Sequence, residues 1–162
     1  MYSFLTPDQD PLPFSEEMLL EFEDHYNFCL PDALKDFYRT CNGMSMVHTP
    51  LVVDGRTYVV DRFIPLFTGN MSADHILDLY SMGNLIPDTY FPLALSDTGD
   101  DFFLDTNTGS IVLLPLERPS KKKEIASDIE SFFTMLENAQ GTHCDTADQA
   151  LSRRIRKKRH TK

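Results

Sequence analysis

The chain of 162 residues contains no tryptophan, only three cysteines and no long apolar run. Cys29, Cys41 and Cys144 are too few and too widely spaced for a disulfide framework, and the first two lie among apolar residues, where cysteine acts as a small hydrophobic side chain. No segment approaches the roughly 20 apolar residues of a membrane helix. Residues 1–13 also lack the basic and then apolar pattern of a signal peptide. We therefore expect a cytoplasmic protein without a membrane span.

Catalytic motifs are missing as well. The sequence contains no Gly-x-Ser-x-Gly, no Gly-rich phosphate loop and no His-Glu-x-x-His. His25 and Cys29 are four residues apart, but two ligands do not make a zinc site. His143, Cys144 and Asp145 have the residue types of a cysteine nucleophile, yet such partners normally meet through the fold rather than as neighbours in sequence. We predict no enzyme activity, no cofactor and no metal site.

Acidic residues outnumber basic ones by 25 to 15, which gives a formal net charge of −10. Seven of the basic residues lie in the last eleven positions, so residues 1–151 carry eight basic against 25 acidic side chains, a net charge of −17. Such a field supports solubility, and it also steers association with a basic partner. Charge alone does not decide between these two roles.

The basic run 153–159 is the single feature typical of nucleic-acid binding. It fits a solubilising tail, a contact with nucleic acid or anionic lipid, a localisation signal, or a segment that folds back onto the acidic domain, because a tethered opposite charge has a high effective concentration. The predicted organisation is an extended lead-in over residues 1–13, one domain over 14–139, and a flexible basic tail over 140–162.

Apolar spacing predicts two helices near the N-terminus. The first begins at Ser15 as N-cap and ends before Leu30-Pro31. The second begins at Pro31 and ends at Asn42-Gly43, with one apolar stripe formed by Leu34, Phe37, Tyr38 and Cys41. A strand over 46–53, a turn at Asp54-Gly55 and a strand over 57–60 follow, and residues 63–67 form a weaker strand candidate.

The second half of the chain alternates helix and strand signals. A helix is expected over 72–82 with Ile76, Leu79 and Tyr80 on one face. Strands over 91–96, 102–105 and 110–116 are joined by tight turns and are therefore antiparallel. A last helix is expected over 124–138, with Ile125 on its buried side. The fold class is α+β, a mostly antiparallel sheet with helices packed on it.

Three segments in this order resemble the SUKH superfamily of bacterial toxin-immunity proteins, which are related to a yeast regulator of cell-wall assembly. The first is Leu30-Pro31, the apolar stripe and Asn42-Gly43, and the second is the stretch FPLALSDTGDDFFLD with Gly99, Asp100 and Asp105. The third is the final helix, from Ile129 to Leu136. The tryptophan that many members carry is absent here, and the tail beyond Gly141 has no counterpart in the family.

The resemblance implies an immunity protein that binds and neutralises a cognate toxin, in the leading form a nuclease, by occluding its active site. A nuclease holds phosphates on a basic surface, which an acidic inhibitor can occupy. An intracellular regulatory scaffold is the alternative, and a metal-dependent hydrolase a third, weaker one. Carboxylates would pair with the toxin's basic residues and one aromatic ring would fill a pocket. The expected contact residues are Asp54, Asp61, Asp97, Asp100, Asp101 and Phe102.

Overall fold

The computed structural model describes residues 2–7, 9–67, 71–83, 86–115 and 117–139. Six strands form one antiparallel sheet in which each strand pairs with the next one along the chain. This confirms the expected α+β class with a mostly antiparallel sheet. The predicted basic tail, residues 140–162, lies outside the described residues. The strands are β1 (Thr49–Val53), β2 (Arg56–Phe63), β3 (Tyr90–Ser96), β4 (Asp101–Asp105), β5 (Ile111–Leu114) and β6 (Lys123–Ala126).

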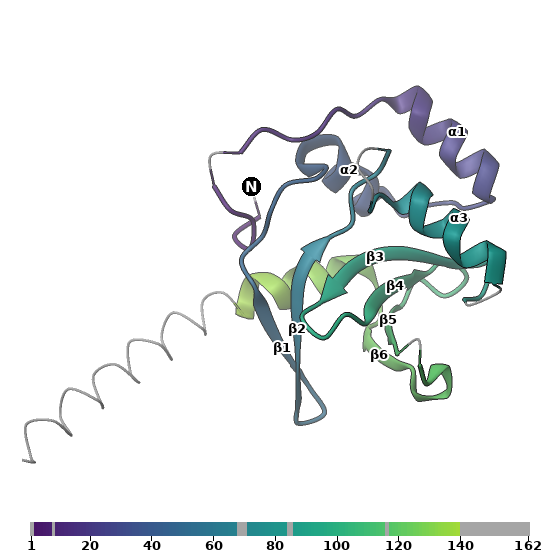
Figure 1. Cartoon of the computed structure of the whole chain (residues 1–162). Helices are drawn as coiled ribbons and strands as arrows, with labels where there is room; N and C mark the ends of the chain where they lie inside the picture. The colour runs from purple at the N-terminus through teal and green to yellow at the C-terminus, as the bar shows by residue number, and fades with distance from the viewer. Residues whose placement is uncertain (1, 8, 68–70, 84–85, 116, 140–162) are drawn as a thin grey trace, which may run out of the picture.

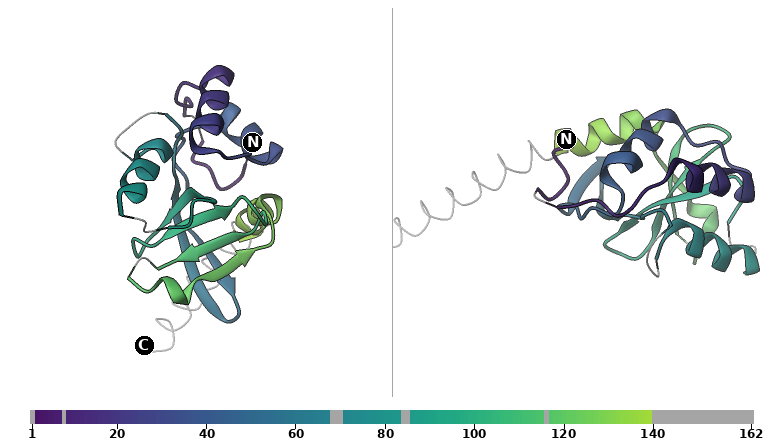
Figure 2. Two further views of the ribbon diagram at one scale, coloured as in Figure 1. Left: turned by 90° about the vertical axis from the view of Figure 1, so that its right-hand side faces the viewer. Right: turned by 90° about the horizontal axis from the view of Figure 1, so that it is seen from above.

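Three helices precede or interrupt the strands: α1 (Glu16–Tyr26), α2 (Asp32–Cys41) and α3 (Ala73–Gly83). They gather at one end of the molecule, and the tip of the β1–β2 hairpin and the short 3-10 helix η1 (Pro119–Lys121) lie at the other (Figures 1 and 2). We call residues 16–41 and 73–83 the helical end, and residues 54–58 and 117–124 the hairpin end. A last helix, 129–139, packs against the sheet.

Most of the core is one aromatic-rich cluster between the sheet, α1, α2 and the last helix. Phe37 of α2, Phe63 of β2 and Phe133 of the last helix pack ring against ring, with centroids 4.8 to 5.9 Å apart. Phe4 and Leu5 belong to this core although they precede every helix. The lead-in is therefore a structural part of the domain, anchored by a bridge between Leu5 and Met46.

The hairpin end owes its position to an irregular register in the sheet. All five residues of β1 pair with β2, but only the second half of β2, from Val60 onward, pairs with β3. The register shifts between Val60 and Arg62, and such a bulge bends and twists the strand. The free half of the hairpin therefore projects past β3, and its tip comes close enough to β6 for Asp54 to pair with Lys123.

The helix predicted over 124–138 is wrong in its first turn. Residues 123–126 form β6, which pairs with β5, and Ile125 is buried from a strand. The helix begins only after Asp128, whose carboxylate accepts from Ser131 N at 2.6 Å and whose carbonyl accepts from Phe132 N. Lys, Glu and Ala favour helix, but pairing with a buried strand outweighs that weak preference.

Two smaller expectations also need correction. Residues 63–67 are not a separate strand, because β2 continues to Phe63 and the chain then forms a loop in which Leu66 N donates to Asn42 Oδ1. On α3, Leu77 rather than Leu79 is buried beside Ile76, at 8% against 51% exposure. Ile76, Leu79 and Tyr80 therefore do not form a single buried face.

Candidate functional site

The Asn-Gly pair that ends α2 holds three parts of the chain together. Asn42 is fully buried. Its Nδ2 donates to the carbonyls of Pro13 and Leu66, and its Oδ1 accepts from Leu66 N at 2.8 Å. Its own carbonyl accepts from Leu12 N. The amide thus satisfies backbone groups of the lead-in and of the loop after β2, so its role is structural rather than partner binding.

Gly43 completes this corner, where both the backbone conformation and the Leu12 side chain disfavour a Cβ. Its φ is +72°, in the left-handed region, and a Cβ at this position would lie 2.2 Å from Leu12 Cδ1. The signature that carries the family resemblance is therefore explained by packing of the lead-in against the end of α2.

Two of the six expected contact residues are inaccessible. Phe102 is 0% exposed and packs in the core at 5.9 Å from the Phe132 ring, so the expectation that it anchors in a partner's pocket is wrong. Asp101 is 3% exposed, so the expectation that it pairs with a partner's basic residue is wrong as well. Successive side chains of β4 point to opposite faces, and both faces are covered here.

The buried Asp101 carboxylate accepts a hydrogen bond of 2.5 Å from the Tyr80 hydroxyl of α3. Burial raises the pKa of Asp101, and this hydrogen bond offsets part of the rise. The neighbours of Asp101 on this face of the sheet are a small cluster of apolar side chains. This cluster consists of Tyr90, Phe103, Val112 and Leu114. Asp101 thus links α3 to the sheet, which is a structural role.

Asp54 and Asp61 are accessible, but each already contacts a side chain of the same chain, a lysine and a histidine respectively. Asp54, at the tip of the β1–β2 hairpin, forms an ion pair with Lys123 of β6, and this pair lowers the pKa of Asp54. Asp61 Oδ1 lies 2.7 Å from His48 Nε2. A basic partner would have to compete with these contacts.

Asp97 and Asp100 occupy the turn between β3 and β4, where Gly99 takes a φ of +89°. Asp97 is exposed and Asp100 half-buried. Asp97 N donates to the carbonyl of Val59, which brings this turn beside β2 and within two residues of Asp61. Asp61, Asp97 and Asp100 are thus gathered in one region, whereas Asp54 lies at the far tip of the hairpin.

The structure separates charge in a way that the sequence count did not show. The helical end carries nine acidic and two basic side chains, a net charge of −7. Both basic residues are engaged: Arg39 with Glu16 and Asp36, and Lys35 with Glu23 at 3.4 Å. The hairpin end carries five basic and three acidic side chains, a net charge of +2. The helical end therefore holds nine of the 23 acidic side chains of residues 1–139, and the hairpin end holds three.

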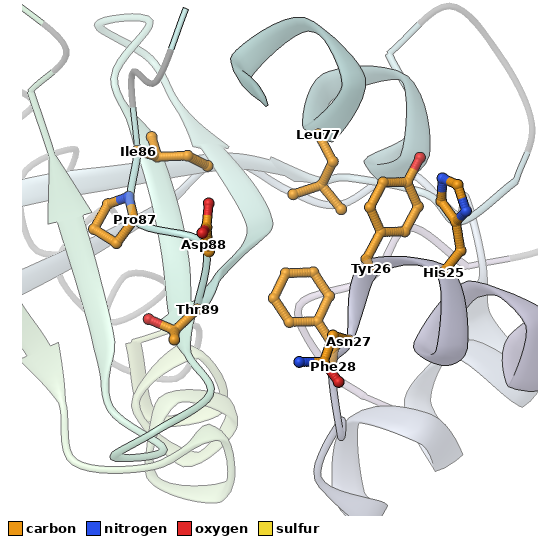
Figure 3. A pocket seen from close by; sticks show the side chains of 9 residues that line it. All are labelled: His25, Tyr26, Asn27, Phe28, Leu77, Ile86, Pro87, Asp88 and Thr89. Carbon is orange, nitrogen blue, oxygen red and sulfur yellow. The ribbon is translucent and has the colours of Figure 1, made fainter. Parts of the chain in front are cut away.

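The sequence analysis missed two further features of the helical end. Leu79 and Met82, three residues apart on α3, are 51% and 87% exposed, and such neighbouring apolar side chains on a surface often mark contact sites. A pocket of about 370 Å³ opens between the end of α1, Leu77 of α3 and residues 86–89 (Figure 3). We call it the α1–α3 pocket. The pocket could not be predicted because residues 86–89 give no helix or strand signal.

Neither a metal cluster nor a membrane helix is found in the part of the chain that the structure describes. No three His, Cys, Asp or Glu side chains there are arranged to hold a metal ion. No helix of those residues is long and apolar enough to cross a bilayer.

Comparison with known proteins adds one decisive match. The model of the SMI1 / KNR4 family (SUKH-1) matches residues 13–135, from the end of the lead-in through most of the last helix. The chain belongs to this family. SUKH-1 domains are generally non-catalytic immunity or regulatory domains, which agrees with the lack of catalytic motifs in the sequence. A search of curated proteins gave no match.

Proposed function

We propose that this SUKH-1 protein is an immunity protein that binds a cognate toxin with a basic surface, in the leading form a nuclease, and blocks the toxin's active site. Family membership carries this conclusion, since immunity proteins are one of the two classes that the family contains. The toxin surface that holds phosphates is basic, and an acidic protein covers such a surface by offering carboxylates in place of phosphates.

The position of the free carboxylates favours the helical end as the binding surface. Glu17 and Glu21 on α1 are both exposed, and no described basic side chain forms an ion pair with either of them. At the hairpin end, by contrast, an approaching cation meets five resident ones. Complementary charge accelerates association and excludes wrongly oriented encounters.

Because Phe102 is buried, the apolar contact with a partner has to come from other side chains, and the helical end provides two. Leu79 and Met82 extend from α3 into solvent. Methionine adapts its shape to different partner surfaces, and a central apolar contact surrounded by charges is the usual arrangement of an interface. α3 thus combines the apolar and acidic side chains that binding a basic protein requires.

The β3–β4 turn remains a second possible binding surface, because Asp97 and Asp100 keep the accessibility that Asp101 lacks. The two surfaces are separated by reversing one pair of charges at a time, Glu17→Lys with Glu21→Lys or Asp97→Lys with Asp100→Lys. The pair whose reversal slows toxin association and flattens its salt dependence identifies the surface. Unchanged kinetics in the Asp97/Asp100 variant removes the turn from the interface.

The function itself is tested by co-expression with the C-terminal domain encoded by the neighbouring gene, which the proposal expects to be a toxin. We expect the full chain to restore growth and to co-purify with that domain. The Lys123→Ala variant serves as a folded control, because it removes only an exposed ion pair at the hairpin end, away from the helical end. Loss of growth in the presence of the folded full chain, with no co-purification, would contradict the proposal.

A regulatory scaffold is the second candidate, because the matching family model is named for SMI1 / KNR4. In that case the chain would bind a partner that is not a toxin, so binding would neutralise no toxic activity. An isolated gene with no toxin-encoding neighbour favours this alternative, and growth rescue by co-expression argues against it.

A further inference from the structure

The α1–α3 pocket has an apolar wall and an acidic rim. Phe28 and Leu77 face residues 86–89 across an open space of about 370 Å³ (Figure 3), a volume within the usual range of ligand sites. Ile86 and the Tyr26 ring extend the apolar lining. This wall can accept an aliphatic side chain, while Asn27, Asp88 and Thr89 add polar groups to the lining.

One carboxylate lines the pocket, and a second is hydrogen-bonded to a residue that lines it. Asp88 lines the opening. Asp78 of α3 is held by the Tyr26 hydroxyl, which donates to its Oδ1 at 2.7 Å and lies 3.1 Å from the carbonyl of Asp74. The closest imidazole, His25, is the single described side chain lining the pocket that can become cationic. An occupant of matching chemistry has an aliphatic side chain between cationic neighbours.

The C-terminal sequence contains a segment of this composition. Ile155 stands between Arg154 and Arg156, and Leu151 precedes it by four residues. Seven of the 15 basic residues of the chain fall within the last eleven positions, and the segment 151–159 is the only stretch of the sequence with an aliphatic residue flanked directly by arginine on both sides.

The tether is long enough for this contact. The last described helix ends at residue 139, and 16 residues separate that point from Ile155. An extended chain of this length spans up to about 50 Å, whereas a domain of this size has a radius of gyration of about 14 Å. The extended length of the segment is thus comparable to the dimensions of the domain, and the tether raises its effective concentration near the domain surface.

We infer that the C-terminal segment 151–159 docks on its own domain at the α1–α3 pocket, with Ile155 in the pocket and Arg154 and Arg156 beside Asp78 and Asp88. This contact is intramolecular and salt-sensitive. Its consequence for partner binding rests on the proposed function: the tail occupies the acidic surface until a partner with a more complementary basic surface displaces it. Weakly basic, incorrect partners are then excluded.

The native cysteines allow a direct test in the full chain. Cys29 is exposed and follows Phe28 of the pocket, whereas Cys41 is buried, so in a Cys144→Ser protein a nitroxide reagent labels Cys29 selectively. Docking brings residues 151–159 close to the label and broadens their amide NMR signals. We expect severalfold greater broadening than in a protein that also carries Arg154→Gln, Ile155→Ser and Arg156→Gln. Raising the salt from roughly 50 mM to 500 mM should abolish the difference.

A matched pair of charge variants locates the contact. Asp78→Asn with Asp88→Asn removes the two rim charges, and the amide Oδ1 at residue 78 still accepts from Tyr26. Glu117→Gln with Glu124→Gln removes two charges from the hairpin end. The first pair should abolish the broadening and the second should preserve it. Equal loss in both pairs means a general attraction to an acidic protein and overturns the docking site.

Two further outcomes would overturn this docking without affecting the proposed function. Absence of broadening at low salt removes the tail contact, even if the toxin domain co-purifies with the chain. Broadening in a mixture of nitroxide-labelled unenriched protein and unlabelled ¹⁵N-enriched protein assigns the contact to a second copy. Conversely, the broadening can meet all the expectations above while the co-expression test gives no growth rescue. That result supports the docking of the tail and contradicts the proposed toxin partner.

Discussion

The helical end and the hairpin end of this SUKH-1 protein carry opposite net charge, and part of the minority charge at each end is paired internally. At the helical end the two cations, Lys35 and Arg39, are paired with carboxylates. At the hairpin end Asp54 is paired with Lys123. The net charge is therefore acidic at one end and basic at the other. The comparison shows that the net charge of a chain does not describe what a partner meets, because pairing and position select which charges are available.

Part of the acidity at the helical end stabilises helices and needs no partner to explain it. Glu16 and Glu17 lie in the first turn of α1 and Asp32 in the first turn of α2, where carboxylates interact favourably with the helix dipole. Glu21 and Asp24 lie beyond the first turn of α1, so this explanation does not extend to them. The surplus that bears on binding is therefore smaller than the net charge of the helical end.

The largest difference between the two ends is expected from the same substitution at two glycines. Gly43→Ala should cost about 2–5 kcal/mol of unfolding free energy, because a left-handed φ and a clash with Leu12 add together. Gly55→Ala in the hairpin has a φ of +79° but open space around a Cβ, so it should cost about 1–2 kcal/mol. Urea unfolding measures both losses.

The clash at Gly43 has its own control. In a protein with Leu12→Ala, the added cost of Gly43→Ala should fall toward the Gly55→Ala value, because Cδ1 and Cγ are gone and only the strain in φ and a 3.2 Å contact with the Cβ of residue 12 remain. Equal losses at the two glycines in the otherwise native chain would show that the lead-in does not pack tightly against the end of α2.

The next effect concerns the attachment of α3 to the sheet. Tyr80→Phe should lower stability by about 1–3 kcal/mol at pH 7, because the buried Asp101 carboxylate loses its donor. The loss should be smaller near pH 4, where a protonated Asp101 depends less on that donor. Urea unfolding of both proteins across this pH range measures the change, and an equal loss at every pH contradicts the assignment.

Asp101→Asn tests the same buried site by removing the carboxyl group that titrates, rather than its hydrogen-bond donor. The pKa of Asp101 is raised in the folded protein, so in this range the folded state binds more protons than the unfolded state does. Its contribution to stability is therefore fully present below the unfolded pKa of about 3.9 and is lost as the pH rises through the folded pKa. The Asn variant should lack this decrease.

A moderate effect is expected on partner association. Glu17→Lys with Glu21→Lys should slow binding of the toxin domain by about tenfold at low salt and flatten its salt dependence. Glu117→Lys with Glu124→Lys makes the same change of charge at the hairpin end and should leave the rate nearly unchanged. Stopped-flow binding measures both rates. Equal slowing would mean that only the net charge of the protein matters.

The smallest effect is expected from Lys123→Ala. Exposed ion pairs add little to stability, so the urea midpoint should not change measurably. The pKa of Asp54 is lowered by Lys123, so it should rise in the variant, as measured by NMR titration of the Asp54 carboxyl group. An unchanged Asp54 pKa would show that the hairpin tip does not contact β6.

Local signals were enough to predict most of the fold. Ser15 accepts from Met18 N as the N-cap of α1, the α2 stripe is buried, and the turns at Asp54-Gly55 and around Gly99 join antiparallel strands as predicted. β6 was missed because its sequence favours helix, and only the contact with β5 makes it a strand. Strand pairing across the chain leaves no local signal in such a short segment.

The candidate site was harder to predict than the fold. Residues such as Asp101 and Phe102 follow a turn, where polar and exposed side chains are expected, but β4 lies in the middle of a sheet covered on both faces. Exposure of Leu79 and burial of Leu77 depend on how α3 is rotated against the sheet. Periodicity identifies an apolar helix face, but only packing determines its direction.

Burial of Phe4 and Leu5 has a practical consequence for work with this family. The family match begins at residue 13, yet both side chains fill the core ahead of it. A recombinant fragment trimmed to the matched residues would lose part of its own interior and expose Phe63 and Phe133, whose rings pack against Phe4. The smallest unit that folds as this domain does is thus longer than the unit that sequence comparison recognises.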